Sequence, residues 1–292
     1  MKSKWLLDDY MLRTSYHEDI RDILKREGFE YHVEKYVPFS DDFGLSLPFS
    51  DKECIVTYGS ISFVKQKIRQ FATLVDGRPK YNYIPGAYLP EKNMECIGYM
   101  PFIEKYENLA NFNYVFTTFK DLQNRKEFFY NIFNTNKIFI RPNSGFKTFT
   151  GLPIHFEEFD FEINSLKQLH HVGDDVLILV SNCKQITEEY RFFIVNREVV
   201  TGSQYKLNDE LNVKEGYSLE ALAIAQEMAR NVWQPDIAYA CDVGIVNGKP
   251  KIIELNSFSS SGFYGCDIPK LIHAIDQVAV MEYNGDISIG EI

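Results

Sequence analysis

Residues 240–256 read Ala-Cys-Asp-Val-Gly-Ile-Val-Asn-Gly-Lys-Pro-Lys-Ile-Ile-Glu-Leu-Asn. The Asn-Gly dipeptide at 247–248 predicts a β-hairpin, because both residues accept a positive φ. On the second strand, side chains two residues apart point to the same face of the sheet. Glu254 and Asn256 are therefore expected to present their oxygens side by side, while Leu255 points into a core.

A carboxylate and an amide oxygen at this spacing suit Mg²⁺, which prefers oxygen ligands. Asp242 joins Glu254 and Asn256 in only one of two hairpin registers. With a two-residue loop it lies opposite Ile253, which belongs on the core side, and faces away. With a three-residue loop at 247–249, a bulged hairpin, it lies opposite Glu254. We favour the bulge, since the other register points an acid at the apolar side. A solvent-facing hairpin with ordinary polar residues is the alternative.

The segment after the hairpin, Ser-Phe-Ser-Ser-Ser-Gly-Phe-Tyr-Gly at 257–265, is expected to be a flexible loop rich in hydroxyls and glycine. Asp267-Ile-Pro269 then predicts the start of an apolar helix, with Asp267 as its N-cap and Pro269 in its first turn. Free N–H groups just beyond a metal site would suit an anion.

The composition restricts the class of protein. A chain of 292 residues suggests about two domains. The formal net charge of -10 argues against a protein that binds the nucleic-acid backbone. Five widely spaced cysteines without a Cys-x-x-Cys pair predict reduced thiols, and no apolar stretch reaches the length of a membrane span. We therefore expect a cytoplasmic protein.

The N-terminal third predicts alternating strands and helices, which favours an open parallel sheet. The Gly59-Ser60 turn between a strand and a helix is a candidate site for a phosphate or a substrate carboxylate; a plain capped helix is the alternative. Residues 77–112 are expected to be irregular. The expected elements are strands at 4–7, 29–36 and 53–58, a helix at 16–27 ended by Gly28, and a helix after Ser60.

Two stretches in the middle of the chain carry candidate ligand contacts. The strand at 137–141 delivers Arg141 to a turn at 143–145, with Lys147 beyond it, an arrangement that can hold phosphates. The alternative is a surface turn with solvated cations. The apolar strand at 175–180 ends in Ser181 and Asn182 and would suit an adenine ring, or is simply a buried strand.

A hairpin about Asn196-Arg197 places Arg191 and Lys206 in otherwise apolar strands. An unpaired buried charge is costly, so each needs a partner. A polyanionic ligand would supply one, and so would an internal ion pair, for instance Arg191 with Glu189 or Glu254. Further helices are expected at 121–133 and from the N-cap Ser218 to about Asn231.

Taken in chain order, these features resemble the ATP-grasp superfamily, and most closely the clade named for one Arg and two Lys that is often found in bacteria and their phages. The resemblance extends over residues 110–280. It implies an α/β (α+β) protein: an open parallel α/β domain at 1–112, a lid subdomain at 113–185 and a catalytic subdomain at 186–292. An origin in a bacterium or a phage-infected cell is expected.

The resemblance also implies roles for single residues. Asp242, Glu254 and Asn256 would hold Mg²⁺. Arg141, Lys147 and Arg191 would contact the phosphates of ATP, with Lys206 near the γ-phosphate or an acyl phosphate, so that Arg191 and Lys206 are the candidate catalytic residues. Leu177, Leu179, Val180 and Ser181 would line the adenine, and the loop at 257–262 would face the acceptor. Arg141-Pro142 stands where many relatives have Lys-Pro, which leaves open which cation meets the adenine-side phosphate.

The implied activity is an ATP-dependent carboxylate–amine ligase. A small-molecule, peptide or protein carboxylate would attack the γ-phosphate, and an amine would attack the resulting acyl phosphate. A nucleotide-binding assembly or regulatory protein without turnover is the alternative. An RNA-joining enzyme is disfavoured by the net charge and by the lack of a basic aromatic stripe.

Overall fold

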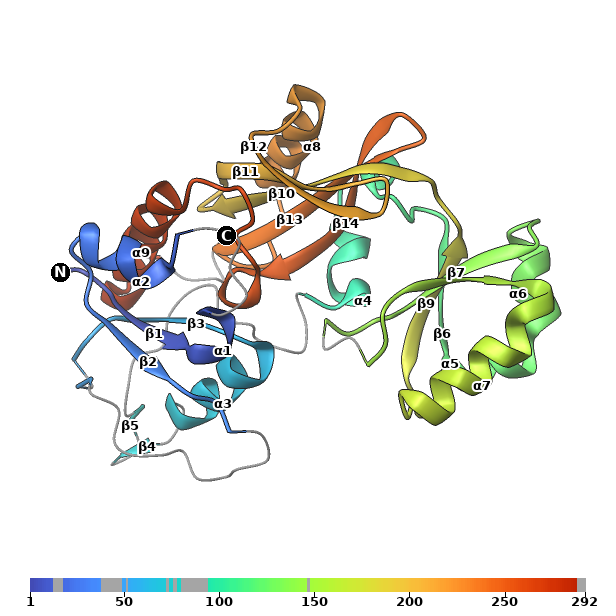
Figure 1. Ribbon diagram of the computed structural model, residues 1–292, viewed down its shortest axis with the longest axis horizontal. Helices are drawn as coiled ribbons and strands as arrows, with labels where there is room; N and C mark the ends of the chain where they lie inside the picture. The colour runs from blue at the N-terminus through green and yellow to red at the C-terminus, as the bar shows by residue number, and fades with distance from the viewer. Residues whose placement is uncertain are drawn as a thin grey trace.

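The computed structural model describes residues 1–12, 18–37, 49–50, 52–71, 74–75, 78–79, 94–145 and 148–287. Figure 1 shows three parts along the long axis: an N-terminal sheet, a central sheet and, at the opposite end from the N-terminus, a lid sheet. No helix in the described ranges has the length and apolar character that a bilayer span requires.

The N-terminal sheet is parallel, with strand order β2-β1-β3, as the sequence predicts. Its strands are β1 (Lys4–Asp8), β2 (Tyr31–Glu34) and β3 (Ile55–Tyr58). The helices are α1 (Asp9–Leu12), α2 (Ile20–Arg26) and α3 (Ile61–Phe71). Asp19 caps α2, and Gly28 follows it with a φ of 73°. Residues 16 and 17 of the predicted helix lie outside the described residues.

The segment predicted to be irregular, 77–112, contains only short elements where it is described. These are strand β5 (Arg78–Pro79), helix α4 (Cys96–Tyr99), and two 3-10 turns at Met100–Phe102 and Tyr106–Asn108. Strand β5 pairs with β4 (Leu74–Val75), which precedes the segment.

The Gly59-Ser60 turn is occupied by the chain's own carboxylate. Asp8, which is fully buried, accepts hydrogen bonds at Oδ2 from Ser60 N (3.0 Å) and Ser60 Oγ (2.6 Å). A Cβ on Gly59 would lie 2.4 Å from Asp8 Cβ, so only glycine fits there. The alternative reading, a capped helix, therefore holds for this turn, and the proposed phosphate or substrate-carboxylate site is not supported.

The lid sheet is antiparallel with strand order β6-β9-β7-β8. Its helices cover one side (Figure 1). The predicted helix at 121–133 is in fact two, broken at Arg125 (φ -129°, ψ 36°). The elements are β6 (Tyr114–Thr118), α5 (Phe119–Asn124), α6 (Lys126–Ile132), β7 (Lys137–Pro142), β8 (Leu152–His155), a 3-10 turn (Phe156–Glu158), α7 (Phe159–Leu169) and β9 (Leu177–Asn182).

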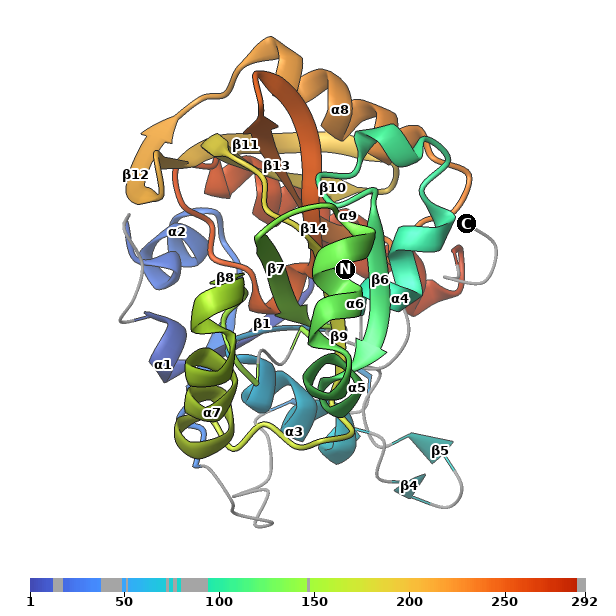
Figure 2. The same ribbon diagram turned by 90° about the vertical axis from the view of Figure 1, so that its right-hand side faces the viewer.

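The central sheet is antiparallel with strand order β12-β11-β10-β13-β14. Helices α8 and α9 lie on opposite faces of it (Figure 2). The predicted caps are confirmed: Ser218 and Asp267 accept from Ala221 N and Lys270 N. The elements are β10 (Ile186–Val195), β11 (Glu198–Leu207), β12 (Glu210–Glu215), α8 (Leu219–Arg230), β13 (Ala238–Val246), β14 (Lys249–Ser257), a 3-10 turn (Phe258–Ser260) and α9 (Ile268–Asn284).

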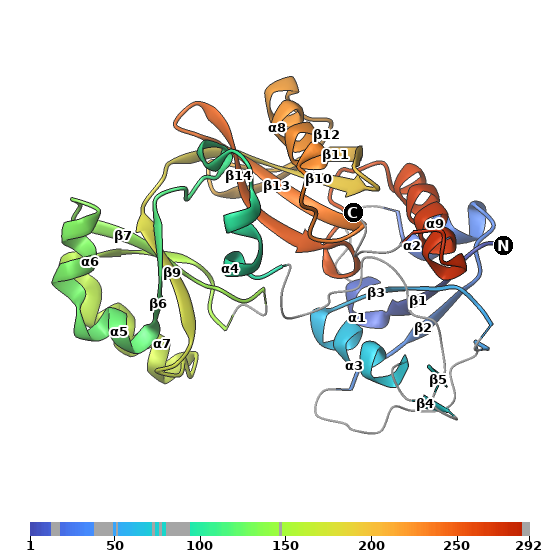
Figure 3. The ribbon, with the colours of Figure 1, turned by 180° about the vertical axis from the view of Figure 1, so that it is seen from behind.

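Alternation along β10 assigns the two faces of the central sheet. Tyr190, Phe192 and Ile194 pack under α8, whereas Phe193 and Val195 pack under α9. Both clusters also include residues of the N-terminal sheet, and α2 lies beside α9 (Figure 3). The lid has a separate cluster formed by its own helices and strands. The division of the chain at 112 and 185 stays a prediction.

Two buried carboxyl groups near α9 make stability depend on pH. Asp236 is 5% exposed and accepts a hydrogen bond from Ile237 N, and Glu282 Oε2 is buried with no hydrogen-bond partner among the described residues. Burial raises the pKa of each to about 7, and for Asp236 the charge of Glu282 contributes to that rise. The folded protein therefore holds these protons at pH values where the unfolded chain releases them.

We expect Asp236→Asn to abolish part of this pH dependence. An unfolded Asp has a pKa of about 3.9, so folding stability falls as pH rises from there to the folded pKa, by up to about 4 kcal/mol. Asparagine keeps the acceptor for Ile237 N and carries no charge. The stability of the variant relative to the wild type should therefore increase as the pH rises from acid to mildly alkaline values. Thermal midpoints across this range measure the difference. The exposed Glu220→Gln is the control, and parallel curves for wild type and Asp236→Asn would contradict the prediction.

Candidate functional site

Three oxygen-bearing side chains meet on one face of β13 and β14, as the sequence predicts. Asp242 lies opposite Glu254, and Ala240 lies opposite Asn256. Asn256 Nδ2 is 3.3 Å from Asp242 Oδ2 and donates to Glu254 Oε1 at 2.9 Å. The structure thus brings the three predicted metal ligands within hydrogen-bonding reach of one another.

The pairing of Asp242 with Glu254 arises from an extra residue at a position other than the predicted one. The hairpin turns on two residues, Asn247 (φ 49°) and Gly248 (φ 76°), so the expected three-residue loop is wrong. The extra residue lies inside β14: Ile252 is opposite Val243, and Glu254 is opposite Asp242, which leaves Ile253 as the bulge.

The bulge explains which side chains of β14 reach the core. Ile252 and Leu255 both pack in the cluster under α8, although they are three residues apart. The predicted core position of Ile253 is therefore wrong, and its side chain lines a cavity instead. The bulge thus moves Glu254 and Asn256 onto the face that carries Asp242.

Arg191 binds Asp242 through two hydrogen bonds. Nε donates to Oδ1 at 2.8 Å and Nη2 to Oδ2 at 2.7 Å, and both side chains are almost fully buried. Nη1 donates to the carbonyl oxygen of Gly262 at 3.2 Å. Burial raises the pKa of Asp242, and the charge of Arg191 opposes that rise. The predicted alternative of an internal ion pair is therefore confirmed for Arg191. Its partner is Asp242, and not Glu189 or Glu254 as suggested.

A second arginine joins the lid to the central sheet. Arg141 of β7 donates from Nη2 to Glu254 Oε2 at 2.8 Å, and the two side chains are 13% and 14% exposed. Next to this pair, Lys206 Nζ lies 3.0 Å from Glu189 Oε1, and the Tyr205 hydroxyl donates to the same carboxylate. Lys147, a predicted phosphate contact, lies outside the described residues.

A cavity of about 640 Å³ separates the lid strands from the central sheet. Of the predicted site residues, Arg141, Lys206 and Glu254 line it, whereas Arg191, Asp242 and Asn256 are not among the lining residues. We call this space the intersheet cavity. Its lining also includes Lys137, Phe139, Cys183, Lys184, Gln185, Glu189, Tyr205 and Ile253.

Several of these residues were missed in the sequence. Lys137, Phe139 and Arg141 alternate along β7 and face the cavity, while Ile138 and Ile140 are fully buried in the lid core. That period of two was visible in the sequence and would have identified two further lining residues.

The strand predicted to line an adenine lies away from the cavity. β9 pairs with β6 on one side and β7 on the other, and Leu179, Val180 and Ser181 are fully buried. Neither these three nor Leu177 is among the lining residues. The segment that does line the cavity, 183–185, follows directly and belongs to no strand.

The loop at 257–262 is packed against the protein and is not the exposed flexible loop that we expected. Ser257, Ser259 and Ser261 are at most 2% exposed. The Ser261 hydroxyl donates to Ser257 O at 2.6 Å, and Ser259 O accepts from Gly59 N at 2.8 Å. These hydroxyls and carbonyls join the loop to itself and to the N-terminal sheet.

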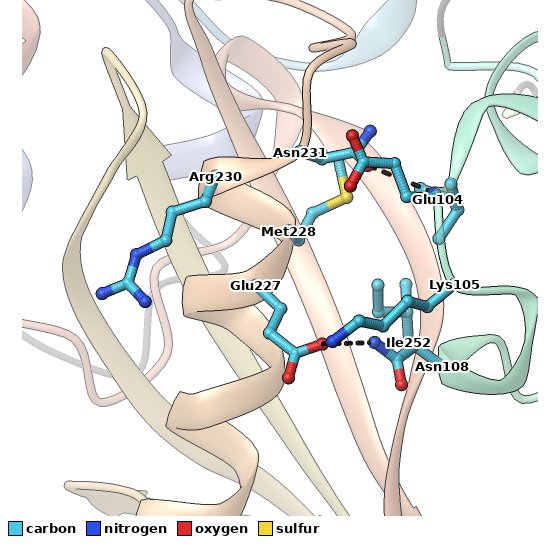
Figure 4. Close-up of a pocket in the computed structure, with 9 residues that line it drawn as sticks. Glu104, Lys105, Asn108, Glu227, Met228, Arg230, Asn231 and Ile252 are labelled. Carbon is cyan, nitrogen blue, oxygen red and sulfur yellow. Dashed lines mark hydrogen bonds and ion pairs between the residues drawn. The ribbon is translucent and has the colours of Figure 1, made fainter.

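A second cavity, of about 170 Å³, lies between α8 and the segment 103–108 (Figure 4). It is smaller than a typical ligand pocket. Its polar side chains also bind one another: Lys105 Nζ and Asn108 Nδ2 reach Glu227 Oε2 at 3.0 and 2.7 Å (Figure 4). We assign it to the packing of this segment against α8.

The donor set at the hairpin fits Mg²⁺. Two carboxylates and one amide supply hard oxygen ligands, and the negative charge of the carboxylates, which now bind Arg141 and Arg191, favours a cation there. Within the described ranges, no cluster of three His, Cys, Asp or Glu is arranged to hold a metal. Asn256 and a ligand's own oxygens would have to complete the coordination.

Comparison with known proteins gives a family. The model of the ATP-grasp domain, R2K clade family 2, matches residues 116–274. No curated protein sequence matches the chain.

Solved structures share the fold. D-cycloserine synthetase DcsG superposes with a TM-score of 0.65 at 10% identity, covering 94% of this chain and 99% of that one. The ATP-grasp ligase PsnB, solved with precursor peptide PsnA2 and AMPPNP, gives 0.58 at 12%, covering 95% and 97%. D-alanyl-alanine synthetase A from Vibrio cholerae O1 biovar eltor gives 0.59 at 12%, covering 98% of each chain.

Proposed function

The chain belongs to R2K clade family 2 of the ATP-grasp domains, and we propose that it is an ATP-dependent ligase that joins a carboxylate to an amine. The observation that carries the proposal is the meeting of Asp242, Glu254 and Asn256 with two arginines beside the intersheet cavity. The family and the α/β fold agree with what the sequence resembles.

We assign the intersheet cavity to the nucleotide. Its volume of about 640 Å³ is that of a typical cofactor site. The base lies at residues 183–185, and the triphosphate extends toward Arg141, Lys206 and Glu254, which line the same cavity. The ring of Phe139, on the face of β7 between Lys137 and Arg141, supplies an apolar wall.

Nucleotide binding exchanges the partners of the Arg141–Glu254 pair. Arg141 turns from the carboxylate to a phosphate, which it can bind through two N–H groups. Glu254, Asp242 and Asn256 would hold Mg²⁺ there. When bound, the ion neutralises charge on the phosphates and orients them. Lys206 exchanges Glu189 for the terminal phosphate in the same way.

The reaction then follows from charge. The donor carboxylate attacks the γ-phosphorus, the bond to the β-phosphate oxygen breaks, and ADP leaves. The amine attacks the acyl carbon of the acyl phosphate, loses a proton and expels phosphate, which forms the amide. Lys206 offsets the charge of the transferred phosphoryl group. Arg191, which lies behind Asp242, acts by holding that carboxylate in place.

Amino acids and peptides are the substrates that we propose to test first. The fold neighbours are named for D-cycloserine and D-alanyl-alanine synthesis and for a complex with a precursor peptide. D-alanyl-alanine and a precursor peptide both carry carboxylate and amine groups, and the same chemistry suits the site proposed here.

ADP release tests the proposal. A coupled assay with MgATP and a panel of amino acids and short peptides, offered singly and in pairs, should find a pair that releases ADP only when both substrates are present. Mass spectrometry should then detect the amide. Nucleotide binding without ADP release from any pair would favour the alternative, an assembly or regulatory protein that retains the site.

A further inference from the structure

Tyr264 has an unusual backbone conformation. Its φ of 48° lies in the left-handed region, which is rare for a bulky aromatic residue. The neighbouring Gly265 is held tightly as well, because a Cβ there would lie 2.8 Å from the carbonyl oxygen of Lys214. A non-glycine residue in this region is strained and persists only where its surroundings impose it. Such strain at the edge of a site suggests a function for the side chain that it places.

The ring of Tyr264 stacks on Tyr205 against the buried arginine. The two ring centroids are 4.7 Å apart with an interplanar angle of 11°. The guanidinium carbon of Arg191 lies 5.0 Å from the centroid of Tyr264 and 5.6 Å from that of Tyr205. Both distances are within the range of a cation–π contact. The rings thus confine Arg191 on the sides that Asp242 and the Gly262 carbonyl leave open.

The stack also joins the two ion pairs of the site. Arg191 binds Asp242 with both oxygens engaged, and the Tyr205 hydroxyl donates to Glu189, which also binds Lys206. A change in the position of Arg191 therefore changes the direction in which the oxygens of Asp242 point.

We propose that Tyr264 is a positioning residue of the metal site: stacked on Tyr205, it fixes Arg191 and through it the carboxylate of Asp242. This inference rests on the proposed function, since it takes Asp242 to be a ligand of Mg²⁺. Without the ring, Arg191 gains freedom and Asp242 meets the ion in more than one orientation, so more Mg²⁺ is needed to fill the site.

The test measures the Mg²⁺ concentration that half-saturates the thermal stabilisation of the protein at a fixed, saturating concentration of ADP. Tyr264→Asn removes the ring, and asparagine tolerates the left-handed backbone, so the variant should fold. We expect its Mg²⁺ midpoint to rise about tenfold, equivalent to about 1.4 kcal/mol and within the range of a desolvated cation–π contact. Tyr264→Phe keeps the ring and should recover the wild-type midpoint.

Tyr217→Asn is the matched control. Tyr217 packs against Phe192 with its ring tilted by 58°, on the face of the central sheet under α8, and its loss should lower the unfolding midpoint without shifting the Mg²⁺ midpoint. Equal Mg²⁺ midpoints in wild type and Tyr264→Asn would overturn the inference, and so would equal shifts in Tyr264→Asn and Tyr264→Phe. A wild type that shows no stabilisation by ADP with Mg²⁺ would instead overturn the proposed function.

Discussion

Replacement of Glu254 by glutamine should weaken the binding of MgATP by about 100-fold or more, equivalent to about 2.7 kcal/mol. The substitution keeps the shape of the side chain and removes its charge, so the metal loses one of two anionic ligands. It also leaves Arg141, now 2.8 Å from Glu254, facing a neutral amide. Binding of ATP without Mg²⁺ should change much less, because Arg141 and Lys206 still face the cavity.

Calorimetric titration of wild type and variant with ATP, in the presence and absence of Mg²⁺, measures this difference. Glu227→Gln is a suitable control, because Glu227 lies on α8, on the other face of the same sheet (Figure 4). An unchanged Mg²⁺ dependence in Glu254→Gln would show that the metal is held elsewhere.

Asp242→Asn should cause the largest loss of stability. Arg191 and Asp242 have side chains 9% and 2% exposed, and removal of one member leaves a buried charge without its counter-ion. Breaking a buried pair in this way costs about 3–5 kcal/mol. For a protein of this size the unfolding midpoint should fall by about 5–8 °C.

The double variant Arg191→Met/Asp242→Leu tests the cause of that loss. If the unpaired charge is responsible, removal of both charges should restore most of the stability, since apolar replacements of buried pairs are often tolerated. Lys167→Met, which breaks the exposed pair with Asp174, should cost less than about 1 kcal/mol. A double variant less stable than Asp242→Asn would show that the loss comes from packing and not from charge.

Local signals predicted the elements of the hairpin and the pairing of Asp242 with Glu254, but not the position of the bulge. Asn247-Gly248 turns the chain as expected, since that preference depends only on two backbones. The position of the bulge was not predicted, because it depends on which isoleucine fits the core under α8. The sequence placed the extra residue in the loop, and the core placed it at Ile253. Asp242 faces Glu254 in both cases, so the predicted pairing is confirmed, although the predicted position of the extra residue is wrong.

Long-range pairing explains the other differences. β9 pairs with β6 and β7 so that Leu179 packs in the cluster under α8 and the Ser181 hydroxyl donates to Asn111 Oδ1, which leaves residues 183–185 to line the cavity. The partner of Arg191 follows from the pairing of β10 with β13, which sets Arg191 opposite Asp242. Neither pairing can be read from a single strand, whereas the cations themselves were visible in the sequence.

The same reasoning applies to the Gly59-Ser60 turn. The glycine and the helix start suggested an anion site, and the turn does hold a carboxylate. That carboxylate belongs to Asp8, whose strand lies next to β3 in the parallel sheet. The predicted site for a phosphate or a substrate carboxylate is therefore not supported, and the alternative, a capped helix, holds.

Nucleotide binding at the intersheet cavity is the central claim, and the thermal unfolding midpoint of the wild type with and without MgATP tests it most directly. A ligand that binds only the folded state adds about 2.7 kcal/mol of stability at about 100 times its Kd. We predict a rise in the midpoint that requires both ATP and Mg²⁺ and that EDTA reverses. An unchanged midpoint at millimolar MgATP would contradict the account and remove the ligase proposal with it.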